Sequence, residues 1–283
     1  MFSLRTLLVL GRTSNLPTVW SNCLAGWWLA GGGNAHKLFP LLLGATLLYV
    51  GGMYLNDAFD ANFDAQHRRD RPIPSGVINV KSVWQIGFGL LGAGLIILFF
   101  LGKTTGILGV LLVLCILIYD AIHKVITLSP VIMAACRFFL YLVAASIAVN
   151  GVVGAAVWSA LALACYIVGL SFLARKESTG VEVNYWPCAF LAAPIFLAWL
   201  MNPGSYRQNA LLLSIVLVLW VVRSLRFAYR AAERSIGRAV SGLLAGIVLV
   251  DLLAVADVPH AFALVFIILL LLALAFQRFV PAT

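Results

Sequence analysis

The chain has 283 residues, of which 63% are hydrophobic and only 10% are charged, and its mean hydropathy is +1.04. This composition excludes a soluble globular enzyme and is typical of a polytopic membrane protein. The formal net charge of +9 comes without a basic domain or an aromatic stacking pattern, so we expect contact with membrane lipid and no nucleic-acid partner.

Ten apolar segments approach the length of a membrane-spanning helix. They cover residues 15–33, 38–56, 83–102, 104–121, 130–149, 152–174, 186–201, 208–225, 239–256 and 261–279. The segment 186–201 is short and contains Pro194, so the sequence predicts nine or ten spanning helices. Because no linker or low-complexity region divides the chain, we expect one all-α transmembrane domain over residues 1–283, with the helices around a central cavity.

Cations are distributed unequally between the two sets of loops. If the N-terminus is cytoplasmic, the outward loops hold only Lys37, Lys103 and Arg207, and the inward segments hold all the other Lys and Arg except Arg137. The positive-inside rule therefore predicts a cytoplasmic N-terminus. We expect a multi-pass protein of the bacterial inner membrane. The longer polar stretches then all face the cytoplasm: residues 57–82, 119–129, 175–186 and 226–238. We expect the chemistry at that face.

An acidic motif ends the second apolar segment. Asn56 and Asp57 are followed by Asp60 and Asp64, and on a helix the three aspartates at i, i+3 and i+7 share one face. Carboxylates at the end of a membrane helix are costly unless they have a function. Magnesium prefers such oxygen ligands and usually shares them with substrate phosphates. We therefore predict that these four residues hold Mg²⁺.

Arginines follow the acidic motif at positions 68, 69 and 71. A guanidinium group matches phosphate oxygens in charge and geometry, so Arg68 and Arg71 are predicted to bind a diphosphate that the metal also contacts. The alternative is a solvated, charge-balanced helix end in which Asp64 pairs with Arg68 at i+4.

The polar stretch 119–129 begins with Tyr119, Asp120, His123 and Lys124 at a predicted helix end. Lys124 can hold a phosphate as a point charge, and Tyr119 can donate a hydrogen bond to a leaving oxygen. The alternative is that these residues anchor the helix at the membrane boundary, where Tyr and Lys are common.

Arg137 lies seven residues beyond Pro130, inside an apolar segment. An unpaired guanidinium at that depth is expensive, so we expect a partner: Asp120, a diphosphate or an acidic acceptor substrate. A structural arginine that extends toward the boundary is the alternative. Near the opposite face, Asp251 and Asp257 are too dispersed to predict a site.

A further polar stretch follows the segment 152–174. Arg175 and Lys176 are predicted to bind phosphate, whereas Glu177 and Glu182 are five residues apart and do not share a helix face. An ordinary cytoplasmic loop is the alternative interpretation.

The acidic motif has the form Asn-Asp-x-x-Asp-x-x-x-Asp and is followed by Arg71-Pro72-Ile73-Pro74-Ser75-Gly76; together they resemble the motif of the UbiA-type intramembrane prenyltransferases. The resemblance implies an all-helical fold with a cavity for a polyprenyl chain, and Mg²⁺ between two Asp-rich motifs and a prenyl diphosphate. It also implies loss of diphosphate from the allylic carbon and attack by a small-molecule acceptor, aromatic or polar. The implied catalytic residues are Asp57, Asp60, Asp64, Tyr119 and Lys124.

Two features depart from the family pattern. The second motif, usually DxxxD, is represented only by Arg175-Lys176-Glu177 and by Glu182, so Glu177 is the candidate ligand for a second metal. The family also has a motif of a tyrosine followed by a lysine in the loop after the fourth span, which Tyr119 and Lys124 resemble. The spacing in some relatives would place His123, in place of Lys124, at the lysine position. The altered second motif indicates a branch other than the ubiquinone, menaquinone or haem-farnesylating members, and the chain resembles the EboC-like bacterial branch.

Two other functions remain possible from the sequence. One is a protein that binds prenyl diphosphate or lipid without turnover, which the altered second motif allows. The other is a cation-coupled transporter, but its site is expected near the bilayer midplane, whereas the acidic motif lies at a helix end beside arginines.

Overall fold

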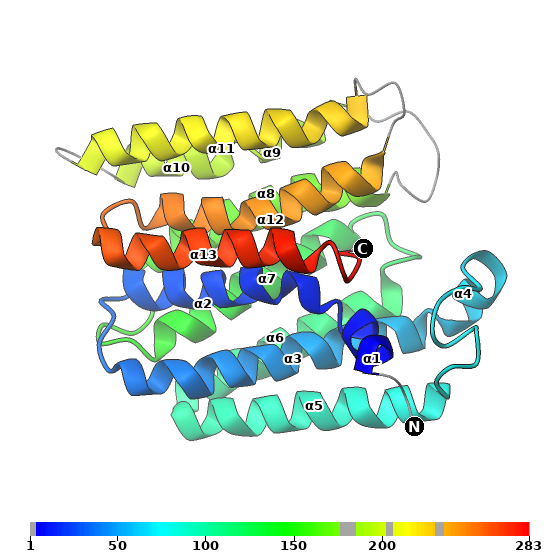
Figure 1. Ribbon diagram of the computed structural model, residues 1–283. Coiled ribbons are helices and arrows are strands. Elements are labelled where there is room, and N and C mark those ends of the chain that lie inside the picture. The colour runs from blue at the N-terminus through cyan, green and yellow to red at the C-terminus, as the bar shows by residue number, and fades with distance from the viewer. Residues whose placement is uncertain (1–3, 176–184, 202–205, 230–234, 283) are drawn as a thin grey trace.

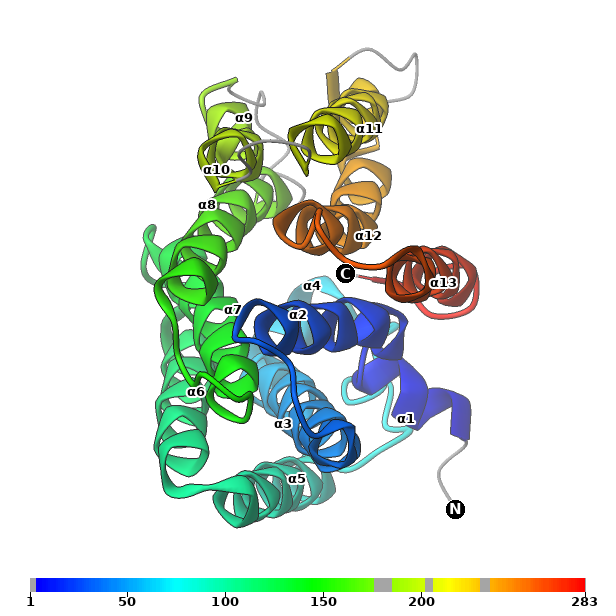
Figure 2. The same ribbon diagram turned by 90° about the vertical axis from the view of Figure 1, so that its left-hand side faces the viewer.

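The computed structural model describes residues 4–175, 185–201, 206–229 and 235–282, and over these residues the chain is helical without strands (Figure 1). The long helices run roughly along one direction and form a bundle, seen end-on in Figure 2. In chain order the elements are α1 (Leu4–Leu10), η1 (Thr13–Asn15), α2 (Leu16–Leu29), η2 (Ala35–Lys37), α3 (Leu38–Phe59), α4 (Ala61–His67), α5 (Val80–Leu101), α6 (Lys103–Ile122), α7 (Ser129–Ser146), α8 (Gly154–Arg175), α9 (Pro187–Phe190), α10 (Ala193–Met201), α11 (Tyr206–Tyr229), α12 (Ile236–Ala254) and α13 (His260–Phe276). The predicted all-α class is confirmed.

Seven of the described helical segments are long and apolar enough to cross a membrane. They are Ala35–Phe59, Val80–Leu101, Lys103–Ile122, Ser129–Ser146, Gly154–Arg175, Arg207–Tyr229 and Ile236–Ala254. Shorter apolar helices are α13 and the pair α9 and α10, in which the segment 186–201 is broken just before Pro194. The chain is thus a multi-pass membrane protein, but the predicted count of nine or ten spans is not confirmed.

Helices α3 and α5 approach each other closely through glycines. A Cβ atom on Gly51 would lie 2.9 Å from the carbonyl oxygen of Gly87, and one on Gly94 would lie 2.9 Å from that of Gly44. The two glycines of each helix are seven residues apart, so each pair lies on one face. Small residues let membrane helices pack backbone against backbone. This packing fixes the direction of α3 and so the position of its acidic end.

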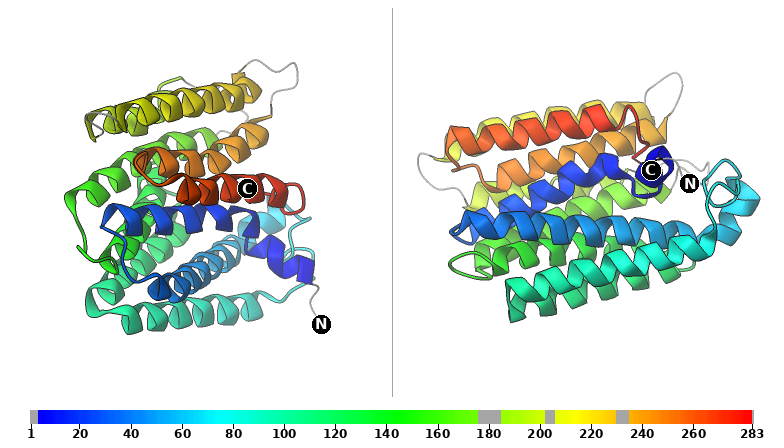
Figure 3. Two further views of the ribbon diagram at one scale, coloured as in Figure 1. Left: turned by 60° about the vertical axis from the view of Figure 1, so that its left-hand side comes forward. Right: turned by 60° about the horizontal axis from the view of Figure 1, so that its bottom comes forward.

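Helices α2 and α7 join the two halves of the bundle. Both contribute to a buried apolar cluster shared with α3, α5 and α6, and both contribute to a larger one shared with α8, α11, α12 and α13. Figure 2 and the left view of Figure 3 show α2 between α3 on one side and α12 and α13 on the other. Polar side chains on α2 and α7 can therefore contact both halves.

The sequence predicted that the acidic motif lies on one uninterrupted helix, but the structure breaks the helix within the motif. Helix α3 ends at Phe59, Asp60 follows it, and the seven-residue α4 begins at Ala61. Asp60 keeps right-handed backbone angles (φ −80°, ψ −4°), and α4 then extends beyond the end of the bundle, as the right view of Figure 3 also shows. The break is small enough that Asp57 and Asp64 still come together.

Candidate active site

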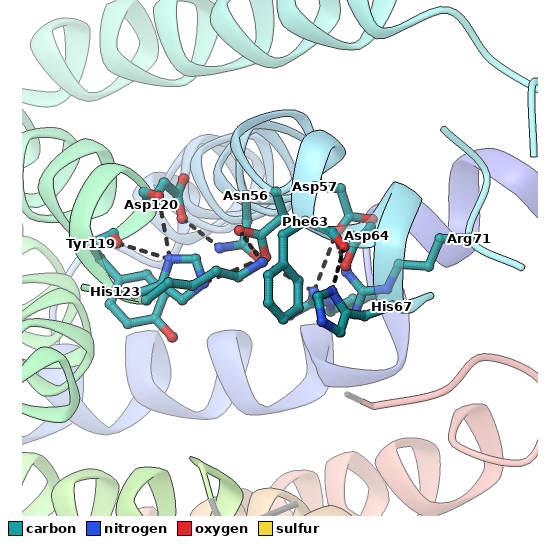
Figure 4. A network of polar contacts seen from close by, with 12 residues as sticks. Asn56, Asp57, Phe63, Asp64, His67, Arg71, Tyr119, Asp120 and His123 are labelled. Atoms are coloured by element: carbon teal, nitrogen blue, oxygen red, sulfur yellow. Dashed lines mark hydrogen bonds and ion pairs between the residues drawn. The ribbon is translucent and has the colours of Figure 1, made fainter. Parts of the chain in front are cut away.

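Arg71 brings together two carboxylates of the acidic motif (Figure 4). Its Nη1 atom lies 3.1 Å from Oδ1 of Asp57 and 3.0 Å from Oδ2 of Asp64, and both aspartates are buried. The alternative pair Asp64–Arg68 does not form, since Arg68 is exposed and Asp64 instead binds Arg71. A buried carboxylate pair needs a cation close by, and Arg71 supplies it.

Arg12 is a second cation at this cluster, and sequence reasoning missed it. Its Nη2 atom lies 3.1 Å from Oδ1 of Asp57 and donates to Oδ1 of Asn56 at 3.2 Å. Its backbone is left-handed (φ 41°, ψ 48°), an unfavourable conformation for a residue other than glycine. The only indication in the sequence was a lone cation just before the first apolar segment.

Asp60 binds the connection between α6 and α7. Nζ of Lys124 lies 2.7 Å from its Oδ1 atom, and Nε2 of His123 lies 3.5 Å from its Oδ2 atom. Burial opposes the charge on Asp60, but the hydrogen bonds from His123 and Lys124 outweigh it, so the pKa of Asp60 is lowered. The ring of Tyr119 stacks on His123 with centroids 4.9 Å apart, and Nζ of Lys124 lies 3.6 Å from the ring centroid of Phe63. Both candidates for the lysine position of the motif therefore reach the same aspartate.

Asp120 is a fourth carboxylate at the site. Asn56 donates from Nδ2 to its Oδ1 atom at 3.0 Å, which links the ends of α3 and α6. Its Oδ2 atom is buried and has no hydrogen-bond partner among the described residues. A buried carboxylate oxygen without a partner is costly, and a cation or a donated proton would relieve that cost.

A cavity extends from this cluster into the bundle between α2, α3, α6 and α7. It encloses about 580 Å³ when the space open to the outside is included, and most of its wall is apolar. Its polar lining comes from Tyr49, Tyr119, Asp120 and Arg137. The cavity therefore connects the acidic end of the bundle with the buried arginine.

Arg137 does not pair with Asp120, one of its three expected partners. Its Nη1 atom donates to Oδ1 of Asn22 at 2.8 Å, and Nη2 donates to Oγ1 of Thr18 at 3.0 Å. Asp251, for which the sequence predicted no site, is buried and accepts from Nδ2 of Asn22 at 2.7 Å. Asn22 thus links Arg137 on α7 to Asp251 on α12.

Arg175 contacts protein groups in place of the predicted phosphate. Its Nη1 atom donates to the carbonyl oxygens of Ile126 and Thr127 at 2.8 and 3.0 Å and to Oγ of Ser129 at 2.8 Å. The guanidinium group therefore holds the connection that carries Lys124. The other residues predicted on this stretch lie outside the described residues: Lys176, Glu177 and Glu182.

Residues 18–178, more than half of the chain, match the model of the UbiA prenyltransferase family. The chain belongs to this family. Among curated proteins, it is 34% identical over 61 residues to a digeranylgeranylglyceryl phosphate synthase of Metallosphaera sedula, covering 22% of each chain. It is 36% identical over 98 residues to the protein of the same name from Methanothrix thermoacetophila, covering 32% of this chain and 37% of that one. The matches thus span between about a fifth and two fifths of these relatives' length.

Solved UbiA structures share the fold of this UbiA family member. A UbiA homologue from Archaeoglobus fulgidus, bound to GPP and Mg²⁺, superimposes with a TM-score of 0.67 at 12% identity, covering 96% of this chain and 99% of that one. The apo structure of a UbiA homologue from Aeropyrum pernix K1 has a TM-score of 0.67 at 14% identity, covering 88% of this chain and 98% of that one.

The carboxylates of this UbiA family member are compatible with Mg²⁺ shared with a phosphate ligand. Within the described part of the chain, no three His, Cys, Asp or Glu side chains converge closely enough to form a complete metal site. Asp57, Asp60 and Asp64 are each paired with a cation, and Asp120 has one unpartnered oxygen. Magnesium commonly takes only one or two carboxylates and completes its shell with water and phosphate oxygens. The residues present fit that mode of binding.

Proposed function

We propose that this chain is a Mg²⁺-dependent prenyltransferase that moves a prenyl group from an allylic diphosphate to an acceptor and releases diphosphate. The observation that supports this best is a cluster of carboxylates next to an apolar cavity. Asp57, Asp60 and Asp64 are each paired with a cation, and Asp120, which Asn56 links to them, lines the cavity. The cluster suits the charged head of the donor, and the cavity suits apolar groups. The homologue from Archaeoglobus fulgidus has GPP and Mg²⁺ bound, which agrees with this proposal.

Mg²⁺ would be held by Asp57, Asp60 and Asp64, with Asn56 and the free oxygen of Asp120 beside them. When bound, it would stabilise the negative charge that collects on the leaving diphosphate. Glu177, the candidate for a second metal, lies outside the described residues.

Three cations are positioned to exchange partners when a donor binds. Arg12 and Arg71 both contact Asp57, and Lys124 contacts Asp60. If Mg²⁺ were held by these carboxylates, the cations now paired with them would be free to bind phosphate oxygens. The cluster has nearly balanced charge, so it can accept a metal and a diphosphate together without a large change in net charge.

The cations then assist the bond-breaking step. The bond between C1 of the donor and the bridging oxygen breaks, and its electron pair leaves with the diphosphate. Arg12, Arg71 and Lys124 stabilise that charge, and Tyr119 can donate a hydrogen bond to the leaving oxygen. The acceptor's nucleophile supplies the electron pair for the new bond to C1, and its proton passes to the departing diphosphate. The apolar cavity wall excludes water, which would otherwise react with the electron-deficient carbon.

We further propose that the site faces the cytoplasm from the cytoplasmic membrane. The support is the cation distribution, since the cations at the site lie on segments that the positive-inside rule assigns to that side. The relatives named above are archaeal, so they lend no support to the expectation of a bacterial inner membrane.

The test is transfer of a labelled prenyl group from allylic diphosphates of several lengths into membrane extract, with Mg²⁺ or with a chelator. We expect product only with metal, and a loss of at least about 100-fold in Asp60→Asn. Asp257→Asn is the matched control. Asp257 is an exposed carboxylate three residues after the C-terminal end of α12, so its replacement should leave transfer unchanged. Tight Mg²⁺-dependent donor binding without product would instead indicate a non-catalytic binding protein.

A further inference from the structure

Helix α11 lies at the edge of the bundle and exposes an apolar stripe along its length, as Figure 1 and Figure 2 show for its position. Leu212, Val216 and Leu219 are 61%, 46% and 65% exposed, and their spacing of i, i+4 and i+7 places them on one helix face. Arg223 and Arg226 continue the same face at i+11 and i+14, and both are exposed. The stripe, which suits lipid acyl chains, therefore ends in two guanidinium groups.

The protein does not neutralise these two arginines. The ion pairs of the described residues involve neither of them. Arg223 lies over the ring of Trp220, with its Cζ atom 5.4 Å from the ring centroid. Trp220 is itself held in place, because its Nε1 atom donates to the carbonyl oxygen of Gly242 on α12 at 2.7 Å. The ring orients the guanidinium group of Arg223 and leaves its N–H donors available to a ligand.

Helix α12 adds a third cation at the same end of α11. The backbone N–H of Ser235 donates to the carbonyl oxygen of Phe227 at 3.0 Å, so the start of α12 lies beside the end of α11. Arg238 is exposed, and its Cζ atom lies 5.7 Å from the ring centroid of Phe227. Phe227 follows Trp220 by seven residues, so both rings lie on one side of α11. Cations from both helices thus border the outer seam between α11 and α12.

Arg223 lies inside the membrane span and not beyond it. The span ends at Tyr229, so the Cα atom of Arg223 is about 9 Å before the end of the helix at 1.5 Å per residue. The stretch from Arg207 to Arg223 extends about 24 Å, which is less than the hydrocarbon thickness of about 30 Å. A lipid-exposed cation at this level is costly unless an anionic group reaches it. A phosphate in the headgroup region above the stripe is close enough to do so.

We propose that Arg223, Arg226 and Arg238 bind the headgroup of an anionic phospholipid whose acyl chain lies along the exposed stripe of α11. The phosphate oxygens accept hydrogen bonds from the guanidinium groups, and the surplus positive charge selects lipids with a net negative charge over zwitterionic lipids. Because the lipid contacts both α11 and α12, it stabilises the packing of an edge helix. The site shares no residue with the acidic cluster and does not depend on the proposed prenyltransferase function.

Native mass spectrometry of the full-length protein tests this proposal. The protein in detergent is incubated with equal amounts of phosphatidylglycerol and phosphatidylcholine that carry the same acyl chains. We expect wild type to retain phosphatidylglycerol in preference, and Arg223→Gln/Arg226→Gln to reduce that preference by roughly tenfold or more. Arg223→Lys/Arg226→Lys keeps the charge but loses the bidentate geometry, so it should retain part of the preference.

A matched removal of two charges elsewhere separates a defined site from general surface charge. Arg5 on α1 and Arg278 after α13 are exposed cations that the positive-inside rule assigns to the same membrane face. Arg5→Gln/Arg278→Gln should therefore keep the wild-type preference for phosphatidylglycerol. An equal loss of preference in this control, or a wild type that retains both lipids equally, would overturn the proposal.

Thermal unfolding gives a second measurement of the same site. Phosphatidylglycerol should raise the Tm of wild type more than phosphatidylcholine does, and this difference should disappear in Arg223→Gln/Arg226→Gln. If that variant does not fold, the preference of wild type and its partial retention in the double lysine variant decide the question. Glycerol phosphate, which has no acyl chains, should not displace the bound lipid, because the apolar stripe contributes to binding. Displacement by glycerol phosphate at the concentration of the lipid would show a site for free phosphate and would overturn the lipid assignment.

Discussion

Lys124 and Asp60 form the shortest ion pair among the described residues, with 2.7 Å between Nζ and Oδ1. The contact joins the end of α3 to the connection after α6, two segments that are more than sixty residues apart in the sequence. His123 reaches the second oxygen of the same carboxylate at 3.5 Å. The two polar segments of the proposed donor site are thus assembled before a ligand binds.

Lys124→Met should lower kcat by roughly 100-fold, because it removes a cation from the charge that develops on the leaving diphosphate. Lys124→Arg should recover part of the rate, since the charge remains while its geometry changes. Steady-state kinetics with saturating acceptor measure both effects. Lys81→Met is the control, as Lys81 is exposed at the start of α5. A Lys124→Met protein with the wild-type kcat would contradict the assigned role.

Arg12 allows a test that separates its guanidinium group from its backbone. Arg12→Ala and Arg12→Gly both remove the contacts with Asn56 and Asp57, so both should weaken donor binding about tenfold or more. Only glycine adopts a φ of 41° without strain, so Arg12→Gly should be more stable than Arg12→Ala by about 1 kcal/mol. Donor titrations and thermal unfolding in detergent measure the two quantities. Unchanged donor affinity in both variants would exclude Arg12 from the site.

The contacts of Arg175 predict a positioning role. Arg175→Gln removes the charged group that holds the carbonyl oxygens of Ile126 and Thr127, so the connection between α6 and α7 should open more often. We expect faster amide hydrogen exchange over residues 123–128 and a fall in kcat of about tenfold, because Lys124 is then less well positioned. Exchange rates equal to those of wild type would show that Arg175 does not hold this segment.

Acid should remove the stabilisation that Asp60 provides. The pKa of Asp60 is lowered in the folded protein, so its contribution is fully present above the unfolded value of about 3.9 and is lost as pH falls through the folded value. Wild type should therefore be more stable than Asp60→Asn at pH 7, and the difference should shrink below about pH 4. Thermal unfolding of both proteins across this range measures the difference. A gap that stays constant down to pH 3 would contradict the ion-pair account.

The sequence was sufficient to predict which carboxylates and cations lie close together at one end of the bundle. Asp57, Asp60 and Asp64 keep nearly the relative positions that a continuous helix would give them. The reason is that Asp60, where the helix breaks, has backbone angles close to helical ones. The polar stretch with Lys124 was predicted at the same end of the bundle, and the ion pair with Asp60 confirms it. Both predictions depend on local periodicity and on which helix ends share one membrane face.

The remaining contacts depend on tertiary packing that periodicity does not describe. Arg12 reaches Asp57 across 45 residues, and nothing in its local sequence indicates this. Hydropathy predicts that Asp251 lies in or beside a membrane segment, but not that its helix faces α2 and that Asn22 meets it there. Arg175 was predicted to bind phosphate from its charge alone, whereas it donates to two backbone oxygens and to Oγ of Ser129. Such partners can be found only when the helices are placed.

The most direct test of the proposed donor site is a structure of the full-length protein with Mn²⁺ in place of Mg²⁺ and a non-hydrolysable prenyl diphosphate. We expect an anomalous scattering peak beside the carboxylates of Asp57, Asp60 and Asp64, near the free oxygen of Asp120. The guanidinium groups of Arg12 and Arg71 should have moved from Asp57 to the phosphates. A metal and diphosphate bound elsewhere, or a diphosphate held at Arg137, would contradict the account.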